Sequence, residues 1–562
     1  MITMYNYYMK VNNYIIGKNK RAKGTYIFAG ISGGYGAGTK KQIGLGWLEQ
    51  LEQINPDVIS ILKTKAKELT EDMEKDFVKQ ELLNSIQNQK ITVNSINYGI
   101  EVIYKFIDKL QIFESISKTK HKDLKSILEY CIASRIINSN SIIRNFEIKD
   151  NFINTIKSQK DAFYSLLDVL VENEKSILKN LNNKVSKITN REIELVFFDS
   201  STVYFETFQR DGLRFPGYSK DGKFKEDQVV LGMATDINGI PIHMKLFKGN
   251  TADPNTFIPF ILDLKQTYQI NNITIISDKG MSTNRNIRFL EDLGINFIIS
   301  YRAKSGSAEF KNYILDQNGY VGNSEFRYKE IEYKSLWNNK RFNGKTRRRI
   351  ITYSKSRAIK DREDRKILIN NFEKRQNKDG IVRGEQMFAS KKYKFFKQIG
   401  RSDFELNYEK VLEDKKFDGI YVYETNRADL TPQEVVQTYQ NQWRIEENFR
   451  TLKTALKVRP VYVWTNSHIK GHFILCYLSL VIIKTIIHLL NESFKKDAGL
   501  IDFKITTDNF IKAILTANKI VKKVDNKIIE TLFETNENNK KDFQNYVLIK
   551  KFTDFIHSKL DI

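Results

Sequence analysis

The chain has 562 residues and a mass of 65.8 kDa, enough for two to four domains, and its 41% hydrophobic and 12% aromatic content excludes a disordered protein. Lysine and arginine number 91 against 67 aspartate and glutamate, a formal net charge of +24 that attracts polyanions, most commonly nucleic acid. The two cysteines, Cys131 and Cys476, are too far apart to indicate a disulfide framework or a zinc site, and they suit a reducing cytoplasm.

Residues 1–190 mix short helical patterns with polar breaks and begin without an apolar run of the signal-peptide kind. The stretch GISGGYGAGTK (Gly30 to Lys40) resembles a phosphate-binding loop. That motif ends in Gly-Lys-Ser/Thr, whereas here Thr39 precedes Lys40. We therefore expect a flexible loop.

Strands and helices alternate from residue 193. The apolar run IELVFFD ends at Asp199, and QVVLGMATDINGIPIHMKLF predicts a hairpin with its turn at Asp236 to Gly239. Asp253-Pro254 predicts a helix through about Tyr268. After it come a strand at Ile273 to Ser277 that ends before Asp278, a helix at NRNIRFLEDLG and a strand at INFIIS. This order predicts a mixed α/β sheet covered by helices.

The next segment, 301–415, carries much of the positive charge. Residues 301–410 hold 28 Lys and Arg against 14 Asp and Glu, a net of +14. We interpret 301–415 as an insertion, because DGIYVYETN (Asp418 to Asn426) predicts a returning strand of the sheet. KRFNGKTRRR (Lys340 to Arg349) and KKYKFFK (Lys391 to Lys397) fit a surface that binds a nucleic-acid backbone. A solvated basic face, in a lineage with lysine-rich proteins, is the alternative.

A long helix is predicted from the capping box Thr431-Pro432-Gln433-Glu434 to about Val458, before Arg459-Pro460. Its core stripe consists of Ile445, Phe449, Leu452 and Leu456. On a single helix Glu446 borders this stripe, and Glu447 lies farther toward solvent. Both could also be ordinary surface residues that face Lys and Arg. A later run, Phe473 to Ile483, is apolar but too short to span a bilayer, and predicts a buried helix.

Three carboxylates could act together. Asp199 and Asp278 each follow a strand-like run, and carboxylates at such positions converge at one sheet edge. Alone, an aspartate there is more often a turn or cap residue. If Asp199, Asp278 and Glu446 lie close together, the three carboxylates repel one another unless a cation neutralises their charge. Oxygen-only ligands suit Mg²⁺ or Mn²⁺, and two such ions can drive phosphodiester displacement.

Over about 195–490 the sequence resembles the cut-and-paste DDE transposases of bacterial insertion sequences. The resemblance lies in FFDSST, GYSKDGKFKEDQVVLGM, LFKGNTAD, SDKGMSTNRNI, YQNQWRIEENFRTLK and VRPVYVWTNSHIKGHFILCYLSL. The family signature is Tyr, two residues, Arg, three residues, Glu, six residues, Lys. Here those positions hold Tyr439, Gln442, Glu446 and Lys453, so Gln442 departs from the pattern.

The resemblance implies an α/β fold with a ribonuclease-H-like catalytic domain, interrupted by a mostly β, basic insertion before the final glutamate. Asp199, Asp278 and Glu446 would be the catalytic residues and ligands of two Mg²⁺ (or Mn²⁺) ions. Tyr439 and Lys453 would contact DNA. Gln442 can donate a hydrogen bond but has no charge, so Arg450 could supply the phosphate contact of the missing arginine.

Two kinds of residue have open alternatives. Trp443, on the signature helix, could stack on an extruded base or simply pack, and Trp337 in the insertion is a weaker stacking candidate. His468 and His472 have metal-ligand spacing, but no third ligand is in view. We interpret both histidines as structural.

The expected organisation is an N-terminal DNA-binding region, catalytic parts on both sides of the insertion, and a helical C-terminal region that pairs protomers. The DNA-binding region is 1–190 and the C-terminal region is 491–562. The catalytic parts are 191–300 and 416–490, and the insertion between them is 301–415. The expected partners are terminal inverted repeats, target DNA and a second copy in a homodimer, with no membrane, in the cytoplasm at the nucleoid. The expected activity is cleavage and strand transfer, with a hairpin intermediate implied by the resemblance. A structure-selective nuclease of the same fold and a non-catalytic DNA-binding relic are the alternatives.

Overall fold

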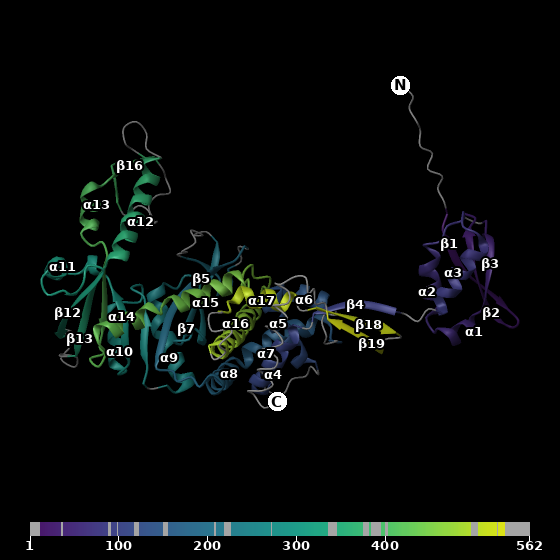
Figure 1. The fold of residues 1–562 in the computed structure, drawn as a ribbon, viewed down its shortest axis with the longest axis horizontal. Coiled ribbons are helices and arrows are strands. Elements are labelled where there is room, and N and C mark those ends of the chain that lie inside the picture. Colours follow the sequence, from purple (N-terminus) through teal and green to yellow (C-terminus); the bar gives the residue numbers. More distant parts are fainter. Residues whose placement is uncertain are drawn as a thin grey trace, which may run out of the picture. The chain divides into compact units, whose positions relative to one another are not determined.

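The computed structural model describes residues 12–34, 37–87, 91–97, 99–116, 123–149, 156–206, 210–217, 226–270, 272–334, 345–374, 382–383, 395–399, 403–495, 504–516, 518–524 and 527–533. The chain divides into two compact units. The first comprises Met1–Asn97 and Asn518–Asn536, and the second comprises Tyr98–Ala517 and Glu537–Ile562. Figure 1 labels their helices and strands.

In the first unit an antiparallel three-stranded sheet packs on three helices. The strands are β1 (Tyr14–Arg21), β2 (Gly24–Ser32) and β3 (Thr39–Trp47), with β2 in the middle. The helices are α1 (Leu48–Ile54), α2 (Val58–Ala66) and α3 (Lys75–Gln87). Their shared core includes Ile27, Leu51 and Leu62. The glycine-rich stretch 30–40 connects β2 to β3, and its two ends belong to those strands.

A second antiparallel sheet of this unit joins distant parts of the chain. It consists of β4 (Ile91–Asn97), β18 (Asn518–Val524) and β19 (Lys527–Phe533), with β18 in the middle. The prediction of a helical C-terminal region is therefore wrong at β18 and β19. Their sequences, NKIVKKV and KIIETLF, are rich in β-branched residues, which favour strands. α17 (Thr507–Thr516) is helical as expected.

The second unit is built on a ten-stranded mixed sheet with the order β11-β12-β13-β17-β10-β9-β5-β7-β6, and β8 pairs with β7. β9 lies parallel to both β5 and β10, whereas β7 is antiparallel to β5 and β8. The predicted hairpin and flanking strands are confirmed. The bounds are β5 (Leu195–Tyr204), β6 (Phe215–Pro216), β7 (Asp227–Thr235), β8 (Pro241–Lys248), β9 (Thr274–Ser277), β10 (Asn296–Tyr301) and β17 (Ile420–Thr425).

Helices cover both faces of this sheet. α9 (Asp253–Tyr268) and α10 (Asn284–Asp292), which match the predicted helices, share a core with Phe198 of β5. On the opposite face, Phe197 belongs to a core with α14 (Pro432–Gln440), α15 (Trp443–Thr454) and α16 (Asn466–Phe494). This division follows from the alternation of side chains along a strand.

Segment 301–415 contributes both strands and helices. β11 (Val321–Gly322), β12 (Phe326–Lys334) and β13 (Thr346–Ser354) extend the large sheet through the pairing of β13 with β17. β14 (Val382–Arg383), β15 (Phe396–Gln398) and β16 (Asp403–Leu406) form a small sheet. Because α11 (Ala308–Leu315), α12 (Lys355–Glu373) and α13 (Tyr408–Lys415) stand among them, the description "mostly β" needs correction.

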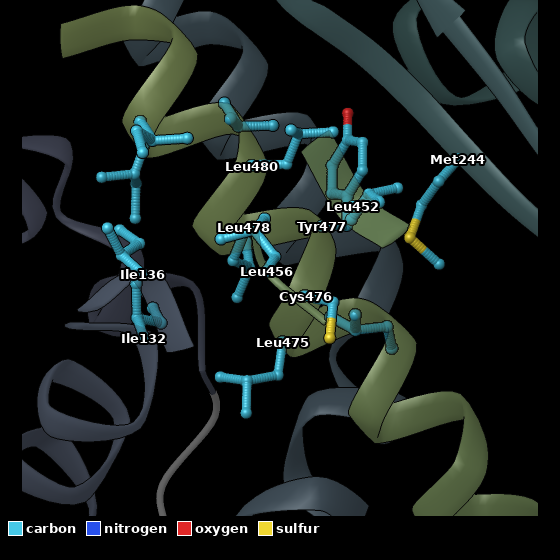
Figure 2. Packing of buried hydrophobic residues seen from close by; sticks show 14 of the residues in the cluster. Ile132, Ile136, Met244, Leu452, Leu456, Leu475, Cys476, Tyr477, Leu478 and Leu480 are labelled. Atoms are coloured by element: carbon cyan, nitrogen blue, oxygen red, sulfur yellow. The ribbon is translucent and has the colours of Figure 1, made fainter. Parts of the chain in front are cut away.

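α16 is the central helix of the second unit. It packs with α5 (Leu124–Ile137) and α7 (Lys160–Glu172), beside α4 (Ile100–Leu110), α6 (Ile142–Ile148) and α8 (Glu174–Thr189). Figure 2 shows Leu475, Leu478 and Leu480 of α16 among side chains of α5 and α15. By length and composition α16 could cross a membrane, but it is mostly buried inside the protein, as the core helix of a globular unit is. The predicted buried helix is confirmed.

Candidate active site

The two predicted aspartates belong to neighbouring parallel strands, with Asp199 on β5 and Asp278 directly after β9. β5 and β9 pair in the register Phe198↔Ser277, so Asp199 and Asp278 each directly follow a paired residue. Adjacent strands are about 4.7–4.9 Å apart. The expected strand end at Asp199 is wrong, since β5 continues to Tyr204 through its pairing with β7. The structure therefore brings the two aspartates together where β9 ends and β5 continues.

Backbone amides hold both carboxylates. Ser200 N donates to Asp199 Oδ1 at 2.8 Å, and Gly280 N donates to Asp278 Oδ1 at 2.7 Å. A Cβ at position 280 would lie 2.8 Å from Asp278 Oδ1, closer than real Cβ contacts allow. Glycine at 280 thus permits the tight turn that orients Asp278.

The helix predicted over 431–458 is two helices. The capping box of Thr431 and Glu434 begins α14 as predicted, but α14 ends at Gln440 and α15 begins at Trp443. Between them Asn441 has φ −71° and ψ −1°, outside regular helix geometry. Because α14 and α15 are not one continuous regular helix, the positions predicted for Glu446 and Glu447 on a single helix do not hold for α15.

Two buried amides anchor α15 to the sheet. Gln442 Nε2 donates to the carbonyl of Phe198, the residue before Asp199, at 3.3 Å. Asn448 Nδ2 donates to Thr235 Oγ1 at 2.7 Å and to the Gly239 carbonyl at 3.0 Å. α15 therefore lies over β5 and β7, on the face of the sheet where Phe197 is buried. Because side chains alternate along a strand, Asp199, two residues after Phe197, points to the same face.

The expected difference between the two glutamates is reversed. Glu446 is exposed, whereas Glu447 is half-buried and its Oε1 accepts a hydrogen bond from Lys484 Nζ of α16 at 2.7 Å. Two polar residues of α15, Asn448 and Thr451, are buried along with the apolar ones. They widen the buried stripe toward Glu447, which apolar periodicity alone does not reveal.

Glu446 lies on α15, the helix that covers the face of the sheet to which Asp199 points. It lies one turn after Gln442, four residues along α15. In the part of the chain that the structure describes, no three His, Cys, Asp or Glu side chains are grouped closely enough to hold a metal ion. The backbone elements of the three predicted ligands thus converge, while their side chains do not form a closed metal site.

The predicted DNA contacts differ in accessibility. Trp443 is 46% exposed, with the Arg444 guanidinium 5.1 Å from its ring centroid, and Arg450 is exposed. Lys453 is half-buried. Tyr439 is buried, and its hydroxyl lies 3.1 Å from that of Tyr421. Burial raises the pKa of Tyr439, with the neighbouring Tyr421 as a second cause.

The amide of Gln442 is also turned inward. Its Oε1 is buried without a hydrogen-bond partner among the residues that the structure describes. The site thus presents Trp443 and Arg450 to solvent, and it holds Tyr439 and Gln442 inside.

The basic stretch Lys340 to Arg349 does not form the expected open surface where it is described. Arg347 pairs with Glu291 at 2.7 Å and with Glu424 at 3.1 Å, and Arg349 pairs with Glu424 at 2.8 Å. Arg348 pairs with Glu330. The prediction of a DNA-binding surface is wrong for these three arginines, because β13 is an inner strand whose side chains meet carboxylates of neighbouring elements. Trp337 lies outside the described residues.

The second basic stretch, Lys391 to Lys397, is described only from residue 395. Phe395 and Phe396 are buried in a small core, so they do not face a nucleic acid. Lys397 is exposed and pairs with Glu405 at 2.6 Å.

Both histidines of the metal-like pair have protein partners. His468 Nε2 lies 3.2 Å from Asp168 Oδ2, and His472 Nε2 lies 3.0 Å from the Val458 carbonyl. Burial lowers the pKa of His472 to about 3, so the imidazole is neutral. These contacts agree with the structural interpretation.

Sequence reasoning missed three residues around the site. Asn448 and Lys484 fix α15, and Asp253 of α9 accepts a hydrogen bond from Ser200 Oγ at 2.9 Å. Lys484 interrupts the apolar helix α16, which is a detectable signal for a buried polar contact, whereas Asn448 stands in the polar sequence of α15 and gives no such signal. In the sequence, Asp253 with Pro254 signals only the start of a helix, and the structure places Asp253 as the first residue of α9.

The chain matches the family model of the transposase DDE domain over residues 190–482, more than half of its length. The chain belongs to this family. The match includes Asp199, Asp278 and the whole of α15, so the converging elements belong to a transposase domain.

Among solved structures, this transposase is similar to a piggyBac transposase in a synaptic complex with hairpin DNA. The identity is 10%, the match covers 74% of this chain and 76% of that one, and the TM-score is 0.35. No curated protein matches the chain.

Proposed function

We propose that the chain is the transposase of an insertion sequence of the Tyr-Arg-Glu-Lys group, which binds terminal inverted repeats, cleaves the DNA strands and transfers them to a target. The observation that supports this most directly is the adjacency of Asp199 and Asp278 on parallel strands, with Glu446 on the helix that covers the same face. The expected ribonuclease-H-like layout is supported by the strand order β8-β7-β5-β9-β10.

Asp199, Asp278 and Glu446 would hold Mg²⁺ or Mn²⁺. The fit rests on the donor chemistry, since carboxylate oxygens without His or Cys suit these hard cations. Two such ions would activate the attacking water or 3′-hydroxyl and stabilise the leaving oxygen. Because Glu446 is exposed, its side chain is free of the core and can turn without repacking α15.

The residues of the chain itself would position the DNA. Arg450 is placed to neutralise a phosphate, and Lys453 on the same helix is a second candidate. Trp443 is exposed enough to stack on a base. Gln442 in place of the family arginine leaves one phosphate contact without charge. Its amide supports the Phe198 carbonyl, so we assign it a positioning role beside Asp199.

The remaining parts of the chain would serve recognition and assembly. Residues 1–190 would bind the repeats, and the division of the chain at residue 97 makes the first unit the candidate for that role. Residues 301–415 would add to the DNA-binding charge between the catalytic parts 191–300 and 416–490. Residues 491–562 would help to pair two protomers into a homodimer. A hairpin intermediate at the excised end belongs to the same proposal.

The proposal can be tested with a cleavage and joining assay. The assay contains the purified protein, Mg²⁺ and a DNA that includes the sequences flanking the gene. We expect strand cleavage at each element end, and joining of pre-cleaved ends to a target plasmid. Cleavage without joining would identify a structure-selective nuclease instead. DNA binding without either reaction would identify a non-catalytic relic. Short inverted repeats bracketed by a direct duplication around the gene would support the transposase before any assay.

A further inference from the structure

The segment 457–465, between α15 and α16, presents two aromatic side chains to solvent. Tyr462 is 61% exposed and Trp464 is 57% exposed, unusual values for such large rings. The valines beside them point the other way, since Val463 is buried and Val461 packs partly against the core. This alternation is that of an extended chain, so both rings share one outer face.

The segment is fixed to the body of the second unit. Buried Arg214 donates to the Trp464 carbonyl at 3.1 Å, and His472 contacts the Val458 carbonyl at 3.0 Å. The Arg459 guanidinium lies 4.4 Å from the ring centroid of Tyr204, the last residue of β5. Thr465, the last residue of the segment, caps α16. The two rings are therefore held outward by the fold, and they do not sit on a frayed end.

The stretch of chain that carries the rings is positively charged. From Asn448 to Asn491 the chain holds six Lys and Arg and no Asp or Glu. Of these six, Lys457 and Arg459 belong to the segment itself, where Lys457 is exposed and Arg459 is half-buried. Two acidic residues nearby are paired, since Asp211 binds Arg214 and Asp168 contacts Ser467 and His468. Exposed aromatic rings on a positively charged surface are suited to bind a polyanion that carries flat apolar groups.

The spacing of the rings favours unpaired bases. Residues i and i+2 of an extended chain are about 6.5–7 Å apart. This is about twice the 3.4 Å rise of bases stacked along one strand, so the two rings match bases that have been separated. β5 also links the segment to the catalytic edge. Tyr204 follows Asp199 by five residues, about 17 Å along the strand.

We propose that Tyr462 and Trp464 stack on unpaired bases of the DNA strand that the active site processes, with Lys457 and Arg459 on its phosphates. This inference rests on the proposed function, because it assigns a further DNA contact to the same transposase. It places the single-stranded stretch beyond the end of β5, whose last residue, Tyr204, lies about 17 Å from Asp199 along the strand, and separates it from the Trp443 contact on α15.

The test is the affinity of the full chain for a labelled single strand and for the duplex of the same sequence. For Tyr462→Ala/Trp464→Ala we expect a loss of about tenfold or more on the single strand and of less than about twofold on the duplex. Trp464→Phe should keep most of the affinity. Tyr408→Ala is the matched control, because Tyr408 is 69% exposed on α13.

An unchanged single-strand affinity in the double variant, or an equal loss on both DNAs, would overturn the inference. The failure of the proposed function can be distinguished from the failure of this inference. If the wild-type chain neither cleaves nor joins DNA but binds a single strand through these rings, the inference stands and the transposase activity does not. If it cleaves and joins DNA and the double variant binds both DNAs as the wild type does, the reverse holds.

Discussion

Lys484 Nζ donates a hydrogen bond to Glu447 Oε1 at 2.7 Å and so joins α16 to α15. Burial lowers the pKa of Lys484, and the pairing with Glu447 acts against that effect. The adjacent Glu446 makes no such contact among the described residues and is exposed. Of the two neighbouring glutamates, Glu447 therefore joins two helices, and Glu446 is the one left accessible for the metal-binding role that we propose.

The first prediction separates these tasks by stability. Glu447→Gln leaves a buried ammonium without its partner charge and should lower the free energy of unfolding by roughly 1–3 kcal/mol. Glu446→Gln changes an exposed side chain and should alter it by less than about 0.5 kcal/mol. Urea denaturation of both variants measures the difference. Adding Lys484→Met to Glu447→Gln should recover part of the loss. Equal stability of the two single variants would contradict the assignment.

The second prediction concerns chemistry. Asp199→Asn, Asp278→Asn and Glu446→Gln should each reduce DNA cleavage at least about 100-fold, because each would remove a charged ligand of the metal ions in the proposed mechanism. Chelation of divalent cations should have the same effect on the wild type. Affinity for DNA should change by less than about threefold in a gel-shift assay. The matched control, Glu447→Gln, should cleave DNA at a temperature where it is folded. Normal cleavage by any one of the three variants would remove that residue from the triad.

The third prediction is a pH dependence of stability from His472. The unfolded imidazole takes up a proton near pH 6.5, whereas burial lowers the pKa in the folded protein to about 3. The contribution of neutral His472 is thus complete above pH 6.5 and is lost as the pH falls toward 3. Between pH 7.5 and 5.5 the loss should be about 1.4 kcal/mol. His472→Gln should lack this part of the slope in denaturation series, and His468→Gln should keep it.

The fourth prediction distinguishes exposed from buried arginine. Arg450→Gln should weaken DNA binding and reduce the slope of log affinity against log salt by about 0.9, as expected for one lost phosphate contact. Arg347→Gln should leave that slope unchanged. It should instead cost roughly 3 kcal/mol in unfolding free energy, because Glu291 and Glu424 lose a buried partner. Binding titrations at several salt concentrations test both variants.

The sequence was sufficient for the elements around Asp199 and Asp278. Strong apolar runs and turn residues predicted the hairpin β7–β8, the helices α9 and α10 and the strands β9 and β10, because local pattern and burial agree there. It was not sufficient for the relation of Glu446 to Glu447. That relation depends on the buried amides Asn448 and Gln442, whose partners lie more than 200 residues away.

The prediction of a DNA-binding surface at the basic segments was wrong for a similar reason. Composition gives the number of arginines in 301–415 but not which of them meet carboxylates across the sheet. Arg347 and Arg349 pair with Glu424, a residue of β17 that is more than 70 positions later in the chain. Strand pairing of this kind becomes visible only once the sheet order is known.

The antiparallel pairing of β4 with β18 has a consequence for biosynthesis. Asn97 lies opposite Asn518, so more than 400 residues must be translated after β4 before its partner strand exists. At 5–20 residues per second a ribosome needs about 20–80 s for that distance. A chain released early, from a broken or frameshifted message, would keep β4 but lack β18. The first unit is therefore completed only in products that are translated past β18 and β19, which ties its finished form to an intact reading frame up to that point.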